Sequence, residues 1–146
     1  MRRLSKFCQL PGVRRWLLIE AALWLLAARL ALRVLPFRWL AKFFERPPKA
    51  PEVVGAERER LREEVRWAIH RATRQLPGKT VCFPRAITAQ VMLRRRGMGT
   101  TLYYGAAKVP GQGLMTHVWV QDGNEGVIGH LMARGYHTLA RYPEVR

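Results

Sequence analysis

Apolar residues dominate the first third of the chain. Between residues 16 and 33 they cover most of the circumference of a helix, because Glu20 and Arg29 lie roughly opposite each other on a helical wheel. The uninterrupted apolar part, residues 21–28, is too short to cross a bilayer. A secretory signal could be that short, but Glu20 and Arg14-Arg15 lie too close to the run to favour one. We therefore expect a helix buried on most sides, which Pro36 ends or kinks.

A short aromatic and basic segment, residues 37–44, follows this helix. It suits a docking surface for a protein or a lipid headgroup layer, and it suits equally a cap on the core. Three closely spaced prolines between residues 45 and 52 then predict an extended connector. A charged helix is predicted over residues 56–76, with an inner face at Leu61, Val65, Ala68, Ile69, Ala72 and Leu76. His70 falls outside this face and is expected at the surface.

The last third of the chain changes to a strand-like pattern. A further helix is predicted from Cys82 to Arg96, where Gly97 ends it. Strands are predicted over residues 100–109, 114–121, 127–129 and 136–142, with turns at 110–113 and 122–126. Helices that precede a small antiparallel sheet make an α+β domain.

The composition narrows the class of protein. A chain of 146 residues with 49% apolar content suits one compact domain. Its net charge of +16 favours acidic partners, such as an acidic protein or peptide, an anionic membrane surface or nucleic acid, but no nucleic-acid-binding motif accompanies the charge. Two cysteines make no disulfide framework, so a reducing, cytoplasmic setting is expected. Cys8 is expected to be a packed, structural residue.

Cys82 and His117 form the candidate chemistry. Pro84 suits a first helical turn, so Cys82 opens its helix, where unpaired N–H groups favour a thiolate. His117 follows 35 residues later in a strand, and an imidazole there could take the thiol proton and return it to a leaving amine. This plan is typical of papain-like and transglutaminase-like thiol enzymes. The ordinary alternatives are a buried cysteine and a histidine packed beside Trp119.

No metal or cofactor is expected. Cys82, His117, His130 and His137 lack the close pairing that metal ligands usually show.

Two motifs resemble one family in order along the chain. Cys82-Phe83-Pro84-Arg85-Ala86, running on to Leu93-Arg94-Arg95-Arg96-Gly97, and then His117-Val118-Trp119-Val120-Gln121-Asp122-Gly123, are similar to those of the lasso-peptide B proteins. These are stand-alone bacterial leader peptidases of the transglutaminase-like superfamily. The apolar N-terminal segment that ends at residues 31–38 also resembles the start of that family.

The resemblance implies a function and partners. Cys82 would be the nucleophile and His117 the general base and acid of a cysteine peptidase. The substrate would be a ribosomally made precursor peptide, whose leader is cut off close to a threonine. A separate leader-recognition protein would deliver the precursor, and an ATP-dependent cyclase would use the freed amine. The chain would then consist of an N-terminal segment (1–46), a proline-rich connector (47–55) and a transglutaminase-like catalytic core (56–146), within one compact domain.

The chain departs from the family pattern at two places. Gln121 stands where the family usually has Glu, and residues 127–130 hold no acid where the superfamily takes its third catalytic residue. Asp122 is five residues from His117, so it should face the other side of the strand, next to a hairpin turn. His130 would be a poor substitute for a carboxylate. A working dyad, a backbone carbonyl that orients the histidine, or an acid from the partner all stay open.

Two other functions compete with the peptidase. The missing carboxylate favours a non-catalytic module that binds an acidic protein or a membrane surface through its basic residues. Charge alone would also fit a nucleic-acid-binding protein.

Overall fold

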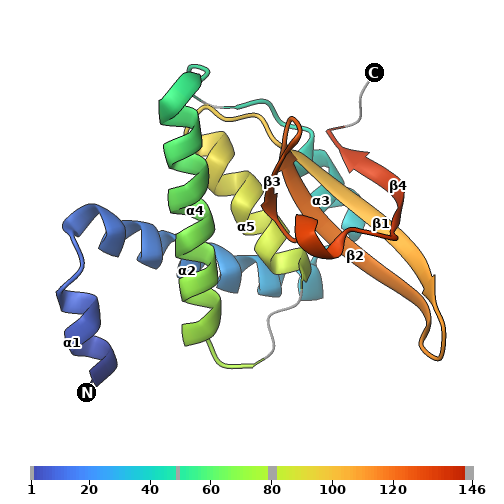
Figure 1. Cartoon of the computed structure of the whole chain (residues 1–146), viewed down its shortest axis with the longest axis horizontal. Helices are drawn as coiled ribbons and strands as arrows, with labels where there is room; N and C mark the ends of the chain where they lie inside the picture. Colours follow the sequence, from blue (N-terminus) through green and yellow to red (C-terminus); the bar gives the residue numbers. More distant parts are fainter. Residues whose placement is uncertain (1, 49, 79–81, 144–146) are drawn as a thin grey trace.

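The computed structural model describes residues 2–48, 50–78 and 82–143, and it confirms the α+β class. Five α-helices precede a four-stranded antiparallel sheet, and the sheet stands against one side of the helices (Figure 1). The helices are α1 (Arg2–Cys8), α2 (Gly12–Val34), α3 (Phe37–Phe44), α4 (Gly55–Gln75) and α5 (Cys82–Arg95). The strands are β1 (Thr101–Val109), β2 (Gly113–Asp122), β3 (Glu125–Ile128) and β4 (His137–Tyr142), with the 3₁₀ turn η1 (His130–Met132) before β4.

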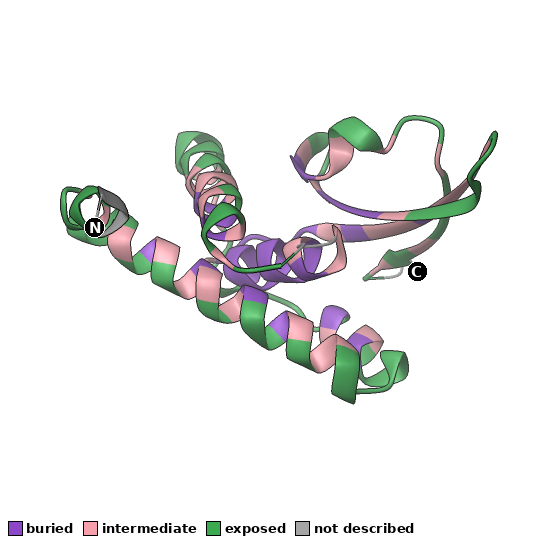
Figure 2. Ribbon diagram, turned by 90° about the horizontal axis from the view of Figure 1, so that it is seen from below, coloured by how far each residue is buried: buried purple, intermediate pink, exposed green. Residues whose placement is uncertain are grey.

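Helix α2 ends before Pro36, as predicted, but its burial differs from the prediction. Its buried residues make a single stripe toward the core, at Leu17, Ala21, Leu25 and Ala28. The other side of the helix carries large apolar residues that are exposed. The expectation of burial on most sides is therefore wrong, because only α4 and α5 pack closely against α2, both on the same side (Figure 2).

Helix α5 is the centre of the fold. Ten of its fourteen residues are buried, from Pro84 to Arg94 with Arg85 left out, because α2, α4 and the sheet surround it. The predicted apolar face of this helix is thus extended to nearly its whole circumference. Even Arg94 is buried, where it donates hydrogen bonds to the carbonyls of Phe43 and Phe44 at 2.8 and 3.0 Å and so holds the end of α3.

The sheet has the order β3-β2-β1-β4, with every neighbouring pair antiparallel. Val118 and Val120 of β2 belong to the core cluster that α5 also joins, so their side of the sheet faces the helices. Successive side chains of a strand alternate between faces, which puts His117 and Trp119 on the opposite side. The chain then crosses from β3 at one edge to β4 at the other by way of η1 (Figure 1).

Arginines of α4 fasten the β2–β3 hairpin to the helices. Asp122, at the end of β2, is buried and accepts hydrogen bonds from Arg58 at 2.9 Å and from Arg62 at 3.1 Å. The bond to Asp122 raises the pKa of the Arg58 guanidinium above its ordinary value. Arg66 donates to the carbonyls of Val127, at 2.9 Å, and Gly126. These contacts fix the strand that carries His117 against the layer that carries Cys82.

Within the described residues, none of the helices has the length and apolar content that crossing a membrane requires. Cys8, at the end of α1, is exposed, so the expectation that it packs in the interior is wrong.

Candidate functional site

Cys82 begins α5, as predicted, and its side chain is partly exposed. Pro84 takes the third helical position, where the lack of an N–H costs nothing because the first N–H groups of a helix have no intrahelical partner. Residues 79–81 lie outside the described part of the chain. The arrangement leaves a partly exposed thiol beside the unpaired N–H groups at the start of a buried helix.

Arg85 lies one turn after Cys82 and is the nearest cation of α5. Burial lowers the pKa of Arg85, and the attraction of Cys82 opposes that effect. The Nη2 atom of Arg85 lies 2.9 Å from Nδ1 of His70 on α4. Because a guanidinium only donates, His70 accepts through Nδ1 and its ring is neutral. Desolvation, followed by repulsion from Arg85 and other arginines, lowers the pKa of His70, which agrees with a neutral ring.

We predict that Arg85→Gln slows the alkylation of Cys82 by iodoacetamide several-fold near neutral pH. The guanidinium and the Cys82 sulfur attract each other, so the change removes a cation from beside the group that attacks the reagent. The rate is measured by mass spectrometry in a Cys8→Ser background, because Cys8 is exposed and would react as well.

Arg95→Gln is the matched control for this experiment. It removes the same charge from the other end of the same helix, where the residue is exposed, and should leave the rate unchanged. Equal rates in the Arg85→Gln variant and the parent would show that Arg85 does not act on the thiol.

His117 lies in β2, as predicted, with its ring enclosed on three sides. Its centroid is 5.9 Å from that of the nearly parallel Trp119 ring and 5.4 Å from that of Tyr136. Its Nε2 atom lies 2.8 Å from the carbonyl oxygen of Gly129. A carbonyl only accepts hydrogen bonds, so Nε2 carries the proton and Nδ1 of the neutral ring keeps the lone pair that could act as a base.

Cys82 and His117 lie on opposite faces of the sheet. Phe83, next to Cys82, packs against Tyr104 with ring centroids 6.1 Å apart, and Tyr104 pairs with Val118 across the β1–β2 ladder. The start of α5 thus packs on the residue of β1 that pairs with Val118, the neighbour of His117. However, α5 packs on the face of Val118, whereas the His117 ring emerges on the face of Trp119.

A main-chain carbonyl is the hydrogen-bond partner of the His117 ring. Of the possibilities left open by the sequence, the orienting carbonyl is the one for which the structure has a partner, Gly129. Asp122 points away from His117 into its ion pairs with Arg58 and Arg62, as the strand alternation predicts. His130 follows Gly129, and its Nδ1 atom is buried without a hydrogen-bond partner.

Gly129 has the geometry that this contact requires. Its φ is +75°, a left-handed conformation that favours glycine, and a Cβ added there would lie 3.2 Å from Nε2 of His117 and 2.9 Å from the carbonyl oxygen of Val118. We therefore predict that Gly129→Ala lowers the free energy of unfolding by about 2 kcal/mol or more, through backbone strain and the clash together. Chemical denaturation measures the loss.

Gly111→Ala separates the two causes. Gly111 has a φ of +77° but nothing lies within 4 Å of an added Cβ, so this variant carries the backbone strain alone. If the two variants lose the same stability, then the contact of Gly129 with the histidine does not constrain the fold.

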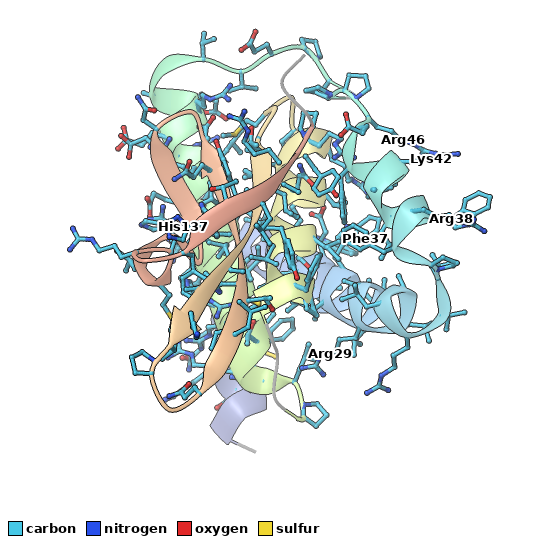
Figure 3. All side chains as sticks on the ribbon, turned by 90° about the vertical axis from the view of Figure 1, so that its right-hand side faces the viewer. Arg29, Phe37, Arg38, Lys42, Arg46 and His137 are labelled. Atoms are coloured by element: carbon cyan, nitrogen blue, oxygen red, sulfur yellow. The ribbon has the colours of Figure 1, made fainter. Side chains whose placement is uncertain are left out.

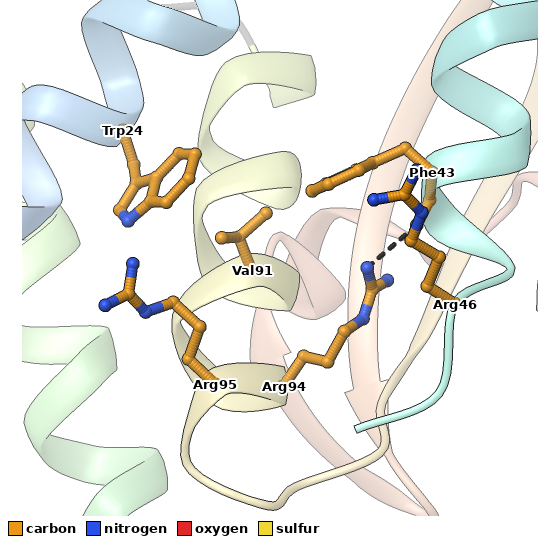
Figure 4. Close-up of a pocket in the computed structure, with 6 residues that line it drawn as sticks. All are labelled: Trp24, Phe43, Arg46, Val91, Arg94 and Arg95. Carbon is orange, nitrogen blue, oxygen red and sulfur yellow. Dashed lines mark hydrogen bonds between the residues drawn. The ribbon is translucent and has the colours of Figure 1, made fainter. Parts of the chain in front are cut away.

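A hollow of about 410 Å³ lies between α2, α3 and the C-terminal half of α5, away from Cys82. Its lining is aromatic and cationic (Figure 4), with Trp24, Phe43, Arg46, Val91, Arg94 and Arg95. Arg94 and Arg46 both lie over the Phe43 ring, and Arg94 is held by the carbonyl end of α3. Arg94 thus holds α3 against α5, while Arg46 packs on the Phe43 ring of α3. Among the described residues, no group of three His, Cys, Asp or Glu could hold a metal ion.

Sequence reasoning missed two residues that shape this site. Arg85 could have been found, because residues three apart on a helix lie on neighbouring positions of its surface. The residues around Gly129 gave no indication of its role, since its contact with His117 depends on how β3 packs against β2.

Comparison with known proteins places this geometry in a family. A model of the transglutaminase-like superfamily matches residues 22–141, which includes α5 with Cys82 and all of the sheet but the last residue of β4. The search of curated proteins and the search of solved structures returned no match. The matched region covers most of the chain, and its order of helices and antiparallel sheet is that of a transglutaminase-like core. The chain therefore belongs to the transglutaminase-like superfamily.

Proposed function

We propose that the protein is a cysteine peptidase that removes the leader from a ribosomally made lasso-peptide precursor. The observation that carries the proposal is the partly exposed thiol of Cys82 at the start of a buried helix, within a transglutaminase-like chain. The motif around Cys82 and the His117-Val118-Trp119-Val120 motif, both similar to those of the lasso-peptide B proteins, supply the substrate class.

The reaction would proceed by covalent catalysis. Nδ1 of His117 takes the proton of the Cys82 thiol, which makes the imidazolium and the thiolate. The thiolate attacks the carbonyl carbon at the end of the leader, and a carbon–sulfur bond forms as the carbonyl becomes an oxyanion. N–H groups at the start of α5 stabilise this oxyanion. The carbon–nitrogen bond then breaks, and the imidazolium of His117 gives its proton to the departing amine of the core peptide. Water hydrolyses the thioester, which releases the leader and restores the thiol.

The position of His117 on the sheet adds a requirement to this mechanism. The Nδ1 atom of His117 is the free base, but its ring lies on the face of β2 opposite the one that packs on α5. The step therefore requires the imidazole to reach the thiol when the precursor is bound. Binding of the precursor with its recognition protein, which the proposal includes as a partner, is the event that would bring the two together.

Reconstitution tests the proposal. The purified protein is incubated with a lasso-peptide precursor and its leader-recognition protein, and the products are identified by mass spectrometry. We expect two peptides whose masses sum to that of the precursor plus one water, with the cut close to a threonine. A precursor that stays intact under these conditions, with a recognition protein shown to bind the leader, contradicts the proposal.

A second candidate function rests on one observation. Because the described part of the sheet has His117 and the α5 layer on different faces, and no carboxylate orients the histidine, the chain also suits a non-catalytic module that binds an acidic partner. The two functions differ in the reactivity of the thiol. Alkylation of Cys82 no faster than that of a simple thiol would favour the binding module.

A further inference from the structure

Helix α2 has a second apolar side that nothing in the described structure covers. Its members recur every three or four residues, at Trp16, Ile19, Leu23, Leu26, Leu30 and Val34. We call these six residues the outer stripe. Exposed fractions of 74% for Trp16, 62% for Leu23 and 62% for Leu30 show that these side chains lie mostly outside the protein core. Figure 2 shows the exposed side of α2 along the edge of the molecule, away from α4 and α5.

The outer stripe and the residues of α2 that pack in the core lie on opposite sides of the helix. At 3.6 residues per turn, the positions of the outer stripe centre on the side opposite the core stripe of Leu17, Ala21, Leu25 and Ala28. The fold thus needs only one of the two apolar sides. Single exposed apolar residues are ordinary in proteins, but a continuous row of six on one helix marks an interaction surface.

The N-terminal segment that carries the outer stripe is strongly cationic. The first 44 residues of the chain contain nine Lys and Arg and a single acid, Glu20. Glu20 is itself bound by Arg96, with Nη2 and Oε2 2.5 Å apart. Beyond the end of the stripe, α3 projects Arg38 and Lys42 outward (Figure 3), and it exposes 59% of Trp39. An apolar row with cationic surroundings and tryptophans near both ends is typical of a helix that lies in a membrane interface.

We propose that the outer stripe docks the protein on an anionic membrane surface, with α2 parallel to the bilayer plane. The apolar side chains enter the boundary of headgroups and acyl chains, while the arginines and lysines contact the anionic headgroups. A second copy of the chain fits less well, because it would place two strongly cationic segments side by side. The inference is independent of the peptidase proposal, since α2 carries neither Cys82 nor His117.

Vesicle sedimentation tests this inference with the full chain. We expect the protein to sediment with vesicles of phosphatidylcholine and phosphatidylglycerol mixed about two to one, and at least tenfold less with phosphatidylcholine alone. Binding should weaken at high salt, because screening reduces the attraction to the headgroups. Failure to sediment with the anionic vesicles at low salt would overturn the inference.

Two double variants distinguish the contribution of the outer stripe to vesicle binding from that of net charge. Leu23→Glu with Leu30→Glu is expected to weaken vesicle binding at least tenfold, because two carboxylates then enter the apolar row. Leu131→Glu with Leu139→Glu is the matched control, since these leucines are 81% and 63% exposed on the sheet side of the molecule. Circular dichroism checks that both proteins fold.

Two results would overturn the inference. Equal weakening by the two pairs would mean that net charge alone drives binding. Binding to an acidic polypeptide such as polyglutamate that depends on Leu23 and Leu30, without vesicle binding that depends on them, would assign the stripe to an acidic protein instead.

Discussion

Leader removal is expected to stop when Cys82 is replaced by alanine, and to fall by at least about a hundredfold when His117 is replaced by alanine. The first change removes the atom that forms the covalent bond, so no slower route through the same intermediate is left. The second leaves the nucleophile in place but removes its general base and acid. The measurement is the rate of leader release, by mass spectrometry, with the precursor and the recognition protein present.

Neither variant should unfold the protein. Cys82 is partly exposed at a helix end and His117 is half-buried, so alanine at either position costs the core little. Trp16→Phe gives a matched control, because it changes an exposed side chain of α2 that the reaction does not use. Processing that continues at the parental rate in the His117→Ala protein would show that the face of β2 opposite α5 takes no part in catalysis. Processing by the Cys82→Ala protein would exclude thiol chemistry altogether.

Asp122→Ala is expected to cause the largest loss of stability of any single change to an ion pair in this fold, about 3–5 kcal/mol. The side chain of Asp122 is 5% exposed, and those of its partners Arg58 and Arg62 are 22% and 12% exposed. Removal of the carboxylate takes the anion from Arg62 and leaves Arg58 with only the exposed Glu52, at 3.8 Å. The loss is a large part of the total stability of a domain of this size, so it should appear in both urea and thermal unfolding.

Glu63→Ala provides the comparison on the same helix. Glu63 pairs with Arg66 at 2.7 Å, but its side chain is 56% exposed, so water screens the pair and its loss should cost under about 1 kcal/mol. A similar loss in the two variants would mean that the hairpin is held by its apolar contacts and not by Asp122. Because β2 carries His117, the Asp122→Ala protein should also lose leader-removal activity at temperatures where it is still largely folded.

Much of the fold follows from local patterns. The proline and glycine positions predicted the end of α2 and the end of α5 to within two residues, and alternation predicted the strands. The burial of α2 was predicted wrongly, because an apolar composition all around a helix does not say how many neighbours the rest of the chain supplies. The burial of α5 was underestimated. Its apolar residues predicted a single buried face, but the structure buries nearly the whole helix.

In the candidate site too, some features could be predicted from the local sequence and others depend on the fold. Cys82 at a helix start and His117 in a strand are local features, and each can be recognised from the residues around it. The carbonyl of Gly129 beside His117, the contact of Arg85 with His70 and the place of Asp122 between two arginines join residues 12 to 64 positions apart.

The sequence by itself determined the class of the fold, the position of Cys82 at a helix start and the cationic character of the N-terminal segment, because each depends on residue type and short-range spacing. The tertiary structure alone decided which side of α2 the core covers, which face of β2 carries His117 and which group orients its ring. These depend on how the helices and the sheet pack together, and contacts between segments distant along the chain have no signature in the local pattern of either segment.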